Sequence, residues 1–195
     1  MNKDLERLIK YIRKEDVAVF IGSGFSFKAG APHVCDIIEA ILKEGGENFT
    51  SENKNKNLRE VSESFVEYCD SRNDLVTLLG KLFDFEVKDT SDQELLRKIP
   101  HIKTIFTTNY DTLIENAYPQ VERVVITSNE GSSYTDEKKV NIYKVHGDIT
   151  TLNSPDGIII TESDYQNYFT SGRYELIWET LKLAFSKKHM LFIGY

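Results

Sequence analysis

The sequence VAVFIGSGFSFKAGAP, residues 17–32, decides the fold because an apolar run leads directly into a series of small residues. Residues 17–21 are apolar and rich in β-branched side chains, which is typical of a strand buried on both faces of a parallel sheet. Gly22 and Gly24 follow at once, and glycines let the backbone approach another group closely. The stretch therefore predicts an α/β fold whose first strand ends at a binding edge.

Composition restricts the class of protein to a soluble, acidic, single-domain chain. The 195 residues are 40% hydrophobic and carry a net charge of −7. That charge argues against direct nucleic-acid binding. No apolar run is long enough for a membrane span, and the two cysteines, Cys35 and Cys69, are expected to be reduced and buried. We therefore expect a cytoplasmic protein without a membrane segment.

The remaining short apolar runs predict further strands. They are KTIFTTN (103–109), ERVVIT (122–127), NIYKVHG (141–147), GIIIT (157–161) and HMLFIGY (189–195). Segments with helical spacing separate them, including DTLIENAY (111–118) and YELIWETLKLAF (174–185). Alternating strands and helices predict a Rossmann-like α/β fold with a mostly parallel sheet flanked by helices, and we expect the last run to be a core strand.

The segment around residues 45–100 predicts a helical layer or cap. Residues 58–68 and 75–83 each place apolar side chains at helical spacing. The polar stretch KEGGENFTSENKNKN, residues 43–57, is predicted to be a loop or an insertion.

Polar residues close three of the predicted strands. These endings are GSG (22–24), TTNYD (107–111) and KVHGD (144–148). Because parallel strands end at one edge of a sheet, Asn109 and His146 are expected beside the glycine turn. Taken singly, these residues have simpler roles: Asn109 and Asp111 are favoured helix caps, and a histidine before a glycine is common in turns.

The glycine turn does not match the dinucleotide fingerprint of dehydrogenases. Gly22 and Gly24 are present, but Phe27 occupies the position of the third glycine. No acidic residue closes a second strand about 20 residues further on. A plain dehydrogenase is disfavoured.

Together the motifs resemble the sirtuin superfamily. GSGFSFKAGAP (22–32), TTNYD and KVHG stand in the order and spacing of the sirtuin nucleotide-binding and catalytic motifs. With IIITESDYQNYF (158–169) and LFIGY (191–195), the chain looks most like the zinc-less sirtuin-like NADase domains of bacterial antiviral defence proteins. The sequence has no cysteine after Cys69, so it lacks the paired cysteines of the zinc module of deacylases.

The resemblance implies an NAD+ glycohydrolase that cleaves NAD+ to nicotinamide and ADP-ribose, with NAD+ as substrate and no metal. Its catalytic residues would be Asn109 and His146. The resemblance places the following residues at NAD+: Gly22, Ser23, Gly24, Ser26, Pro32, Thr108 and Asp111. ADP-ribosyl transfer, protein deacylation and nucleotide binding without turnover remain as alternatives.

The resemblance also carries expectations about organisation. Residues 1–195 would form one NAD-binding catalytic domain, the N-terminal portion of a larger protein. Such domains act in antiphage defence as homo-oligomers joined to a sensor or regulatory domain or subunit.

Overall fold

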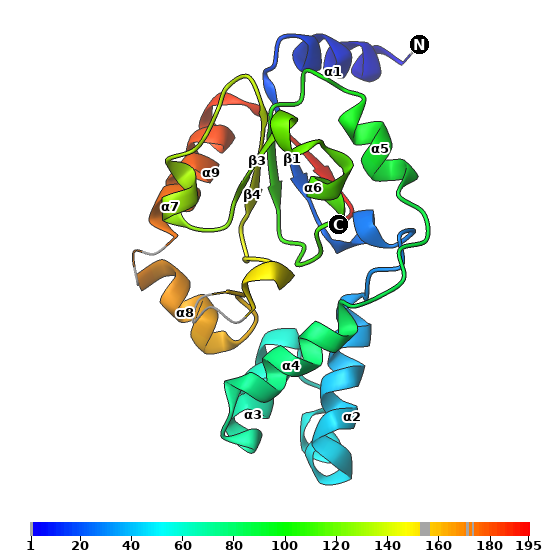
Figure 1. Ribbon diagram of the computed structural model, residues 1–195, viewed down its shortest axis with the longest axis vertical. Coiled ribbons are helices and arrows are strands. Elements are labelled where there is room, and N and C mark those ends of the chain that lie inside the picture. Colours follow the sequence, from blue (N-terminus) through cyan, green and yellow to red (C-terminus); the bar gives the residue numbers. More distant parts are fainter. Residues whose placement is uncertain (1, 153–156, 171, 173) are drawn as a thin grey trace.

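The computed structural model describes residues 2–152, 157–170, 172 and 174–195, and these contain a sheet of five strands, all parallel. The strand order is β3-β4-β2-β1-β5 (Figure 1). The strands are β1 (Val17–Ile21), β2 (Thr104–Thr107), β3 (Arg123–Ile126), β4 (Val140–Lys144) and β5 (His189–Ile193). The predicted Rossmann-like α/β class is confirmed.

Helices cover both faces of the sheet (Figure 1). On one side lie α5 (Ser91–Arg97) and α6 (Leu113–Ala117), and on the other lie α7 (Asn129–Ser132) and α9 (Glu175–Lys187). Because side chains alternate along a strand, β1 supplies Val19 to the cluster under α5 and α6 and Ala18 to the cluster under α9. Helix α1 (Lys3–Arg13) lies at the amino-terminal edge of the sheet.

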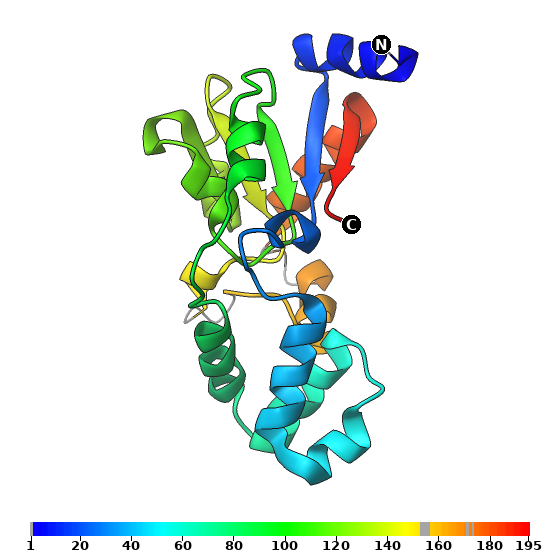
Figure 2. The same cartoon turned by 90° about the vertical axis from the view of Figure 1, so that its right-hand side faces the viewer.

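A helical cap stands beyond the carboxyl edge of the sheet, as Figure 2 shows. It consists of α2 (Val34–Asn53), α3 (Leu58–Cys69) and α4 (Arg72–Leu82), with α8 (Glu162–Thr170) packed against α3. Its core is a cluster of buried apolar side chains that includes Ile37, Ile41, Phe49, Val61, Phe65, Leu75 and Leu79. The predicted helical layer is confirmed, and its core also includes Tyr110, Leu152, Ile158 and Ile160 from the segments that follow β2 and β4.

The prediction of a loop or insertion at residues 43–57 is wrong for most of these residues. Helix α2 continues to Asn53 and is kinked at Gly46, whose φ of 81° only glycine adopts without strain. Phe49 is buried after the kink, and the Thr50 hydroxyl donates to the carbonyl of Leu42. The sequence shows no helical pattern here because Phe49 is the one apolar side chain that the second part of the helix buries.

Three further expectations need correction. Residues 157–161 form a buried extended segment with a single bridge, Gly147 to Ile158, instead of a strand. Strand β5 pairs only with β1 among the described residues and is half-exposed, so it is an edge strand. Cys35 is exposed and Cys69 partly buried, so the prediction of two buried thiols is wrong, although both are free.

None of the helices in the described ranges has the length and apolar composition of a membrane span.

Candidate active site

The register of the sheet brings three strand ends to one level. Ile21 pairs with Thr107, and Thr107 pairs with Lys144. The amide of Thr108 donates to the carbonyl of Ile21 at 3.2 Å, and the amide of Val145 donates to Thr107 at 2.9 Å. The residues that follow β1, β2 and β4 therefore emerge side by side, as the sequence predicted.

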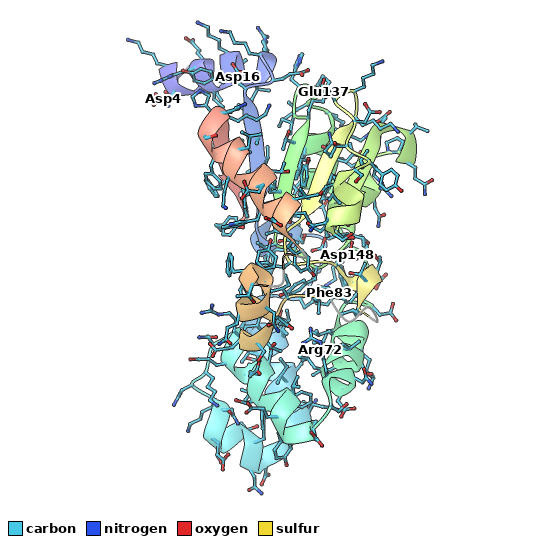
Figure 3. The ribbon with its side chains drawn as sticks, turned by 90° about the vertical axis from the view of Figure 1, so that its left-hand side faces the viewer. Asp4, Asp16, Arg72, Phe83, Glu137 and Asp148 are labelled. Carbon is cyan, nitrogen blue, oxygen red and sulfur yellow. The ribbon has the colours of Figure 1, made fainter. Side chains whose placement is uncertain are left out.

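A cavity of about 180 Å³ lies between this edge and the cap. The sheet edge and its loops supply its polar lining: Ser23, Thr108, Asn109, Asp111 and His146. The cap, the connection that leads into it and Tyr110 of the loop after β2 supply the mainly apolar lining: Ala31, Pro32, Val34, Ile37, Leu58, Phe83, Tyr110 and Tyr165. Figure 3 shows Phe83 and Asp148 at this junction, whereas Asp16 and Glu137 lie at the opposite end of the sheet.

Asn109 is held by two hydrogen bonds, and its side-chain oxygen has no partner in the part of the chain that the structure describes. Its side-chain amide donates to the Ser26 hydroxyl at 3.0 Å, and its main-chain amide donates to the Thr107 hydroxyl at 3.0 Å. Its Oδ1 is buried and has no hydrogen-bond partner among the described residues. Buried acceptors without a partner are rare, so this oxygen is suited to accept a hydrogen bond from a ligand or a water molecule.

Asp111 and Thr108 are anchored differently at the same edge. The Asp111 carboxylate is buried and accepts from the amide of Leu113 at 3.0 Å, so it caps the start of α6 as well as lining the cavity. The Thr108 hydroxyl lies 3.3 Å from the Tyr195 hydroxyl. Asn109, by contrast, does not cap the helix, which removes the simpler interpretation of that residue.

His146 enters the cavity two residues after β4. Its Nδ1 lies 3.5 Å from the Tyr165 hydroxyl, and the two rings meet edge to face at a centroid distance of 5.3 Å. Burial lowers the pKa of His146 to about 4. The imidazole is therefore neutral at physiological pH and able to accept a proton.

The glycine turn approaches protein backbone at the edge of the sheet. The amide of Gly22 donates to the carbonyl of Ile193 and that of Gly24 to the carbonyl of Gly194, at 2.9 and 3.0 Å. A Cβ on Gly22 would lie 2.7 Å from the Gly194 oxygen. These glycines fit the turn against the end of β5, and their contact with a diphosphate remains a prediction.

The structure thus gathers six of the nine predicted site residues on the cavity wall: Ser23, Pro32, Thr108, Asn109, Asp111 and His146. Gly22, Gly24 and Ser26 lie outside that lining, and Ser26 is fully buried behind Asn109. Phe83 and Tyr165 also line the cavity and were not assigned to the site from the sequence. Helical spacing predicts a helix up to Phe83 but not which of its sides faces the cavity, and it predicts no helix at Tyr165.

The described residues contain no group of three or more His, Cys, Asp or Glu side chains arranged to hold a metal ion.

Comparison with known proteins gives a family match for part of the chain. Residues 103–195 match the family model of the SIR2-like domain, which covers β2 to β5 and includes Asn109 and His146. The resemblance to sirtuins is confirmed by this match.

Curated relatives extend the similarity over the whole chain. NAD(+) hydrolase ThsA of Acinetobacter baumannii (strain 532279) is 28% identical over 167 residues, which is 84% of this chain and 33% of the relative. NAD(+) hydrolase ThsA of Enterococcus faecium is 29% identical over 194 residues, 98% of this chain and 39% of the relative. The protein of that name from Bacillus cereus (strain MSX-D12) is 27% identical over 206 residues, 100% of this chain and 41% of the relative. The chain spans 33 to 41% of the length of these relatives.

Proposed function

We propose that this chain is the catalytic domain of an NAD+ glycohydrolase, which releases nicotinamide and ADP-ribose from NAD+. The observation that carries the proposal is the meeting of Asn109 and His146 on one cavity at the carboxyl edge of a parallel sheet. The relatives named NAD(+) hydrolase support the same reaction.

The reaction breaks the bond between nicotinamide and C1′ of the ribose and forms a bond between C1′ and a water oxygen. Nicotinamide leaves with the bonding electron pair, and the ribose passes through an oxocarbenium-like state. The attacking water loses one proton. The protein must therefore orient the ribose, hold the water and accept that proton.

Asn109 and His146 are suited to these tasks. Oδ1 of Asn109 would accept a hydrogen bond from the water or a ribose hydroxyl, since it has no other partner in the described part of the chain. His146 with its proton on Nδ1, directed at Tyr165, would have Nε2 free to accept the proton from water. Asp111 would hold the carboxamide of nicotinamide, and Ser23 with the glycine turn would lie near the diphosphate.

Two other reactions share the first half of this chemistry. In ADP-ribosyl transfer a protein side chain replaces water, and in deacylation an acyl-lysine oxygen attacks C1′. The two cysteines of the sequence are too few for a cysteine-built zinc module, which favours hydrolysis over deacylation. The proposed reaction needs no metal, so chelators should leave it unchanged.

We place the protein in the cytoplasm, as a homo-oligomer controlled by a sensor domain or subunit in antiphage defence. The free thiols support a reducing compartment, and the resemblance to defence NADases supports the rest. Exposed apolar side chains on α9 and β5 favour a covered face: Leu176, Leu183, Phe185 and Phe192. The net charge of −7 disfavours nucleic acid as a partner.

Nicotinamide release from NAD+ tests the proposal. The complete protein, with its trigger supplied by phage infection, should lower cellular NAD+ and produce nicotinamide and ADP-ribose in equal amounts. Labelled NAD+ distinguishes the alternatives, because transfer leaves the label on protein and deacylation requires an acylated peptide. Intact NAD+ in the triggered protein would refute the proposal.

A further inference from the structure

Lys144, the last residue of β4, is a lysine with no exposed side-chain surface. Lysines are almost never fully buried unless they are paired. Its partner is Glu115 of α6, whose Oε1 lies 3.0 Å from the Lys144 ammonium nitrogen. The roles proposed above for the strand-end residues do not use this pair.

The ammonium also donates to the main-chain carbonyl of Asp111. The Lys144 ammonium thus links β4 to two other parts of the fold, helix α6 and the loop that follows β2. That loop carries Asn109, and the strand end that carries Lys144 also carries His146 two residues later. The contact therefore joins the two segments that hold the proposed catalytic residues.

Stability alone does not account for this arrangement. The free energy lost when two charges are removed from water is about as large as the free energy of their attraction. A buried ion pair is therefore weak evidence of stabilisation. Burial raises the pKa of Glu115, and Lys144 offsets this only in part. Oε2 of Glu115 has no hydrogen-bond partner among the described residues. What the pair does provide is a fixed position for the Asp111 carbonyl.

We infer that Lys144 is a positioning residue, which holds the loop of Asn109 and Asp111 at a set distance from the end of β4 and so from His146. The inference rests on the proposed NAD+ hydrolysis for its effect on rate. Small displacements of a catalytic group lower the rate steeply, by about 100-fold for 1 Å.

The test compares Lys144→Met with a matched substitution at the other end of the same strand. Asn141 is also buried in β4, and its side chain bonds to the main chain of Asp136. In the complete, triggered protein, Lys144→Met should lower kcat for nicotinamide release about 10- to 100-fold with little change in KM. Asn141→Ala should lose stability but retain kcat. Equal losses of kcat in both variants would show a purely structural role and overturn the inference.

A double variant covers the case in which Lys144→Met fails to fold. Lys144→Met with Glu115→Gln removes both charges, so no unpaired charge remains buried. It should recover much of the stability without recovering kcat, because the donor to the Asp111 carbonyl is still missing. Wild-type kcat in this variant would overturn the inference.

Hydrogen exchange gives a readout that does not need turnover. In the double variant the amides of Asn109 and Leu113 should exchange faster than in the wild type, and the amides of the strands should exchange at unchanged rates. In Asn141→Ala the amides of Asn109 and Leu113 should stay protected. Unchanged protection in the double variant would refute the positioning role. If the wild-type protein released no nicotinamide, the proposed function would fail, and this exchange comparison would still decide the inference.

Discussion

The two walls of the cavity are built on different principles. The sheet edge is a set of strand ends whose polar side chains are fixed by hydrogen bonds to other side chains or to the main chain, such as Asn109 to Ser26 and Asp111 to the amide of Leu113. The cap wall is formed largely by apolar side chains, including Ile37 and Phe83, backed by a separate hydrophobic cluster. The sheet wall is held by specific hydrogen bonds, while the cap wall supplies apolar contact area.

Because of this difference, we expect substitutions in the two walls to have different effects. Changes in the sheet wall should alter the rate of bond cleavage, since it carries the residues proposed to be catalytic. Changes in the cap wall should mainly alter substrate affinity. The following experiments test that division, beginning with the largest expected effect.

The largest effect is expected for the proposed catalytic residues. Asn109→Ala and His146→Ala should each lower the rate of nicotinamide release about 10²- to 10⁴-fold, because positioned proton transfer and water orientation act in the transition state. Binding of intact NAD+, measured by calorimetric titration, should persist. Circular dichroism and thermal unfolding serve as controls for the fold. A near-normal rate in either variant would remove that residue from the mechanism.

The glycine turn should show the next largest effect. A valine at Gly22 would place its Cβ 2.7 Å from the Gly194 oxygen, so the turn and the end of β5 must separate. Overpacking of this kind costs about 1–3 kcal/mol, and NAD+ affinity should fall with it.

The matched control for that variant is Gly80→Ala in α4. Among the described residues its added Cβ would meet a Leu152 methyl carbon at 3.9 Å, an ordinary van der Waals contact, and alanine favours the helix. It should unfold at the same temperature as the wild type or above it. Unimpaired stability and NAD+ binding in Gly22→Val would show that the close approach to Gly194 is not required.

A change in the cap should have a smaller effect, seen in KM. The Phe83 ring lines the cavity and meets Tyr110 edge to face at 5.9 Å. Phe83→Ala should raise KM for NAD+ several-fold, because it removes apolar contact area from the cavity wall, with kcat nearly constant. Phe169→Ala on exposed α8 surface is the control. A fall in kcat larger than the rise in KM would break the division between the two walls.

The smallest expected effect is an absence of pH dependence near neutrality. With a pKa of about 4 for His146, kcat/KM should stay flat from about pH 5.5 to 7.5 and fall only toward pH 4. A histidine with an ordinary pKa would make kcat/KM fall as the pH drops through about 6.5. A fall there would show that the site is more hydrated than its burial indicates.

The same pKa has a consequence for stability. The unfolded chain binds more protons than the folded chain between pH 4 and 6.5, so this histidine's contribution is complete above pH 6.5 and is lost as pH falls. His146→Gln should make the free energy of unfolding less dependent on pH in that window. An unchanged slope in denaturant titrations would contradict the shifted pKa.

The sequence predicted the sheet wall better than the cap wall. Parallel strands end at one edge whatever their order, so the residues closing β1, β2 and β4 could be expected to meet. The burial of Lys144 could not be predicted, because a charged residue inside an apolar strand gives no sign of its partner on another element. The contact of Gly22 with Gly194 could not be predicted either, because the two residues are far apart in the sequence. From the sequence alone, close approach of a ligand was the simpler explanation for a glycine at position 22.

The hydrogen bonds of the site also impose an order on its assembly during synthesis. Asn109 and Ser26 are 83 residues apart, and Thr108 and Tyr195 are 87 apart. Contacts between such distant residues form late, because closing long loops costs entropy before the contact repays it. Helices α2, α3 and α4, by contrast, follow one another directly in the chain and pack against one another, so their mutual contacts can form first. We therefore expect a chain emerging from the ribosome to form the contacts among α2, α3 and α4 before Asn109 and His146 meet on the cavity.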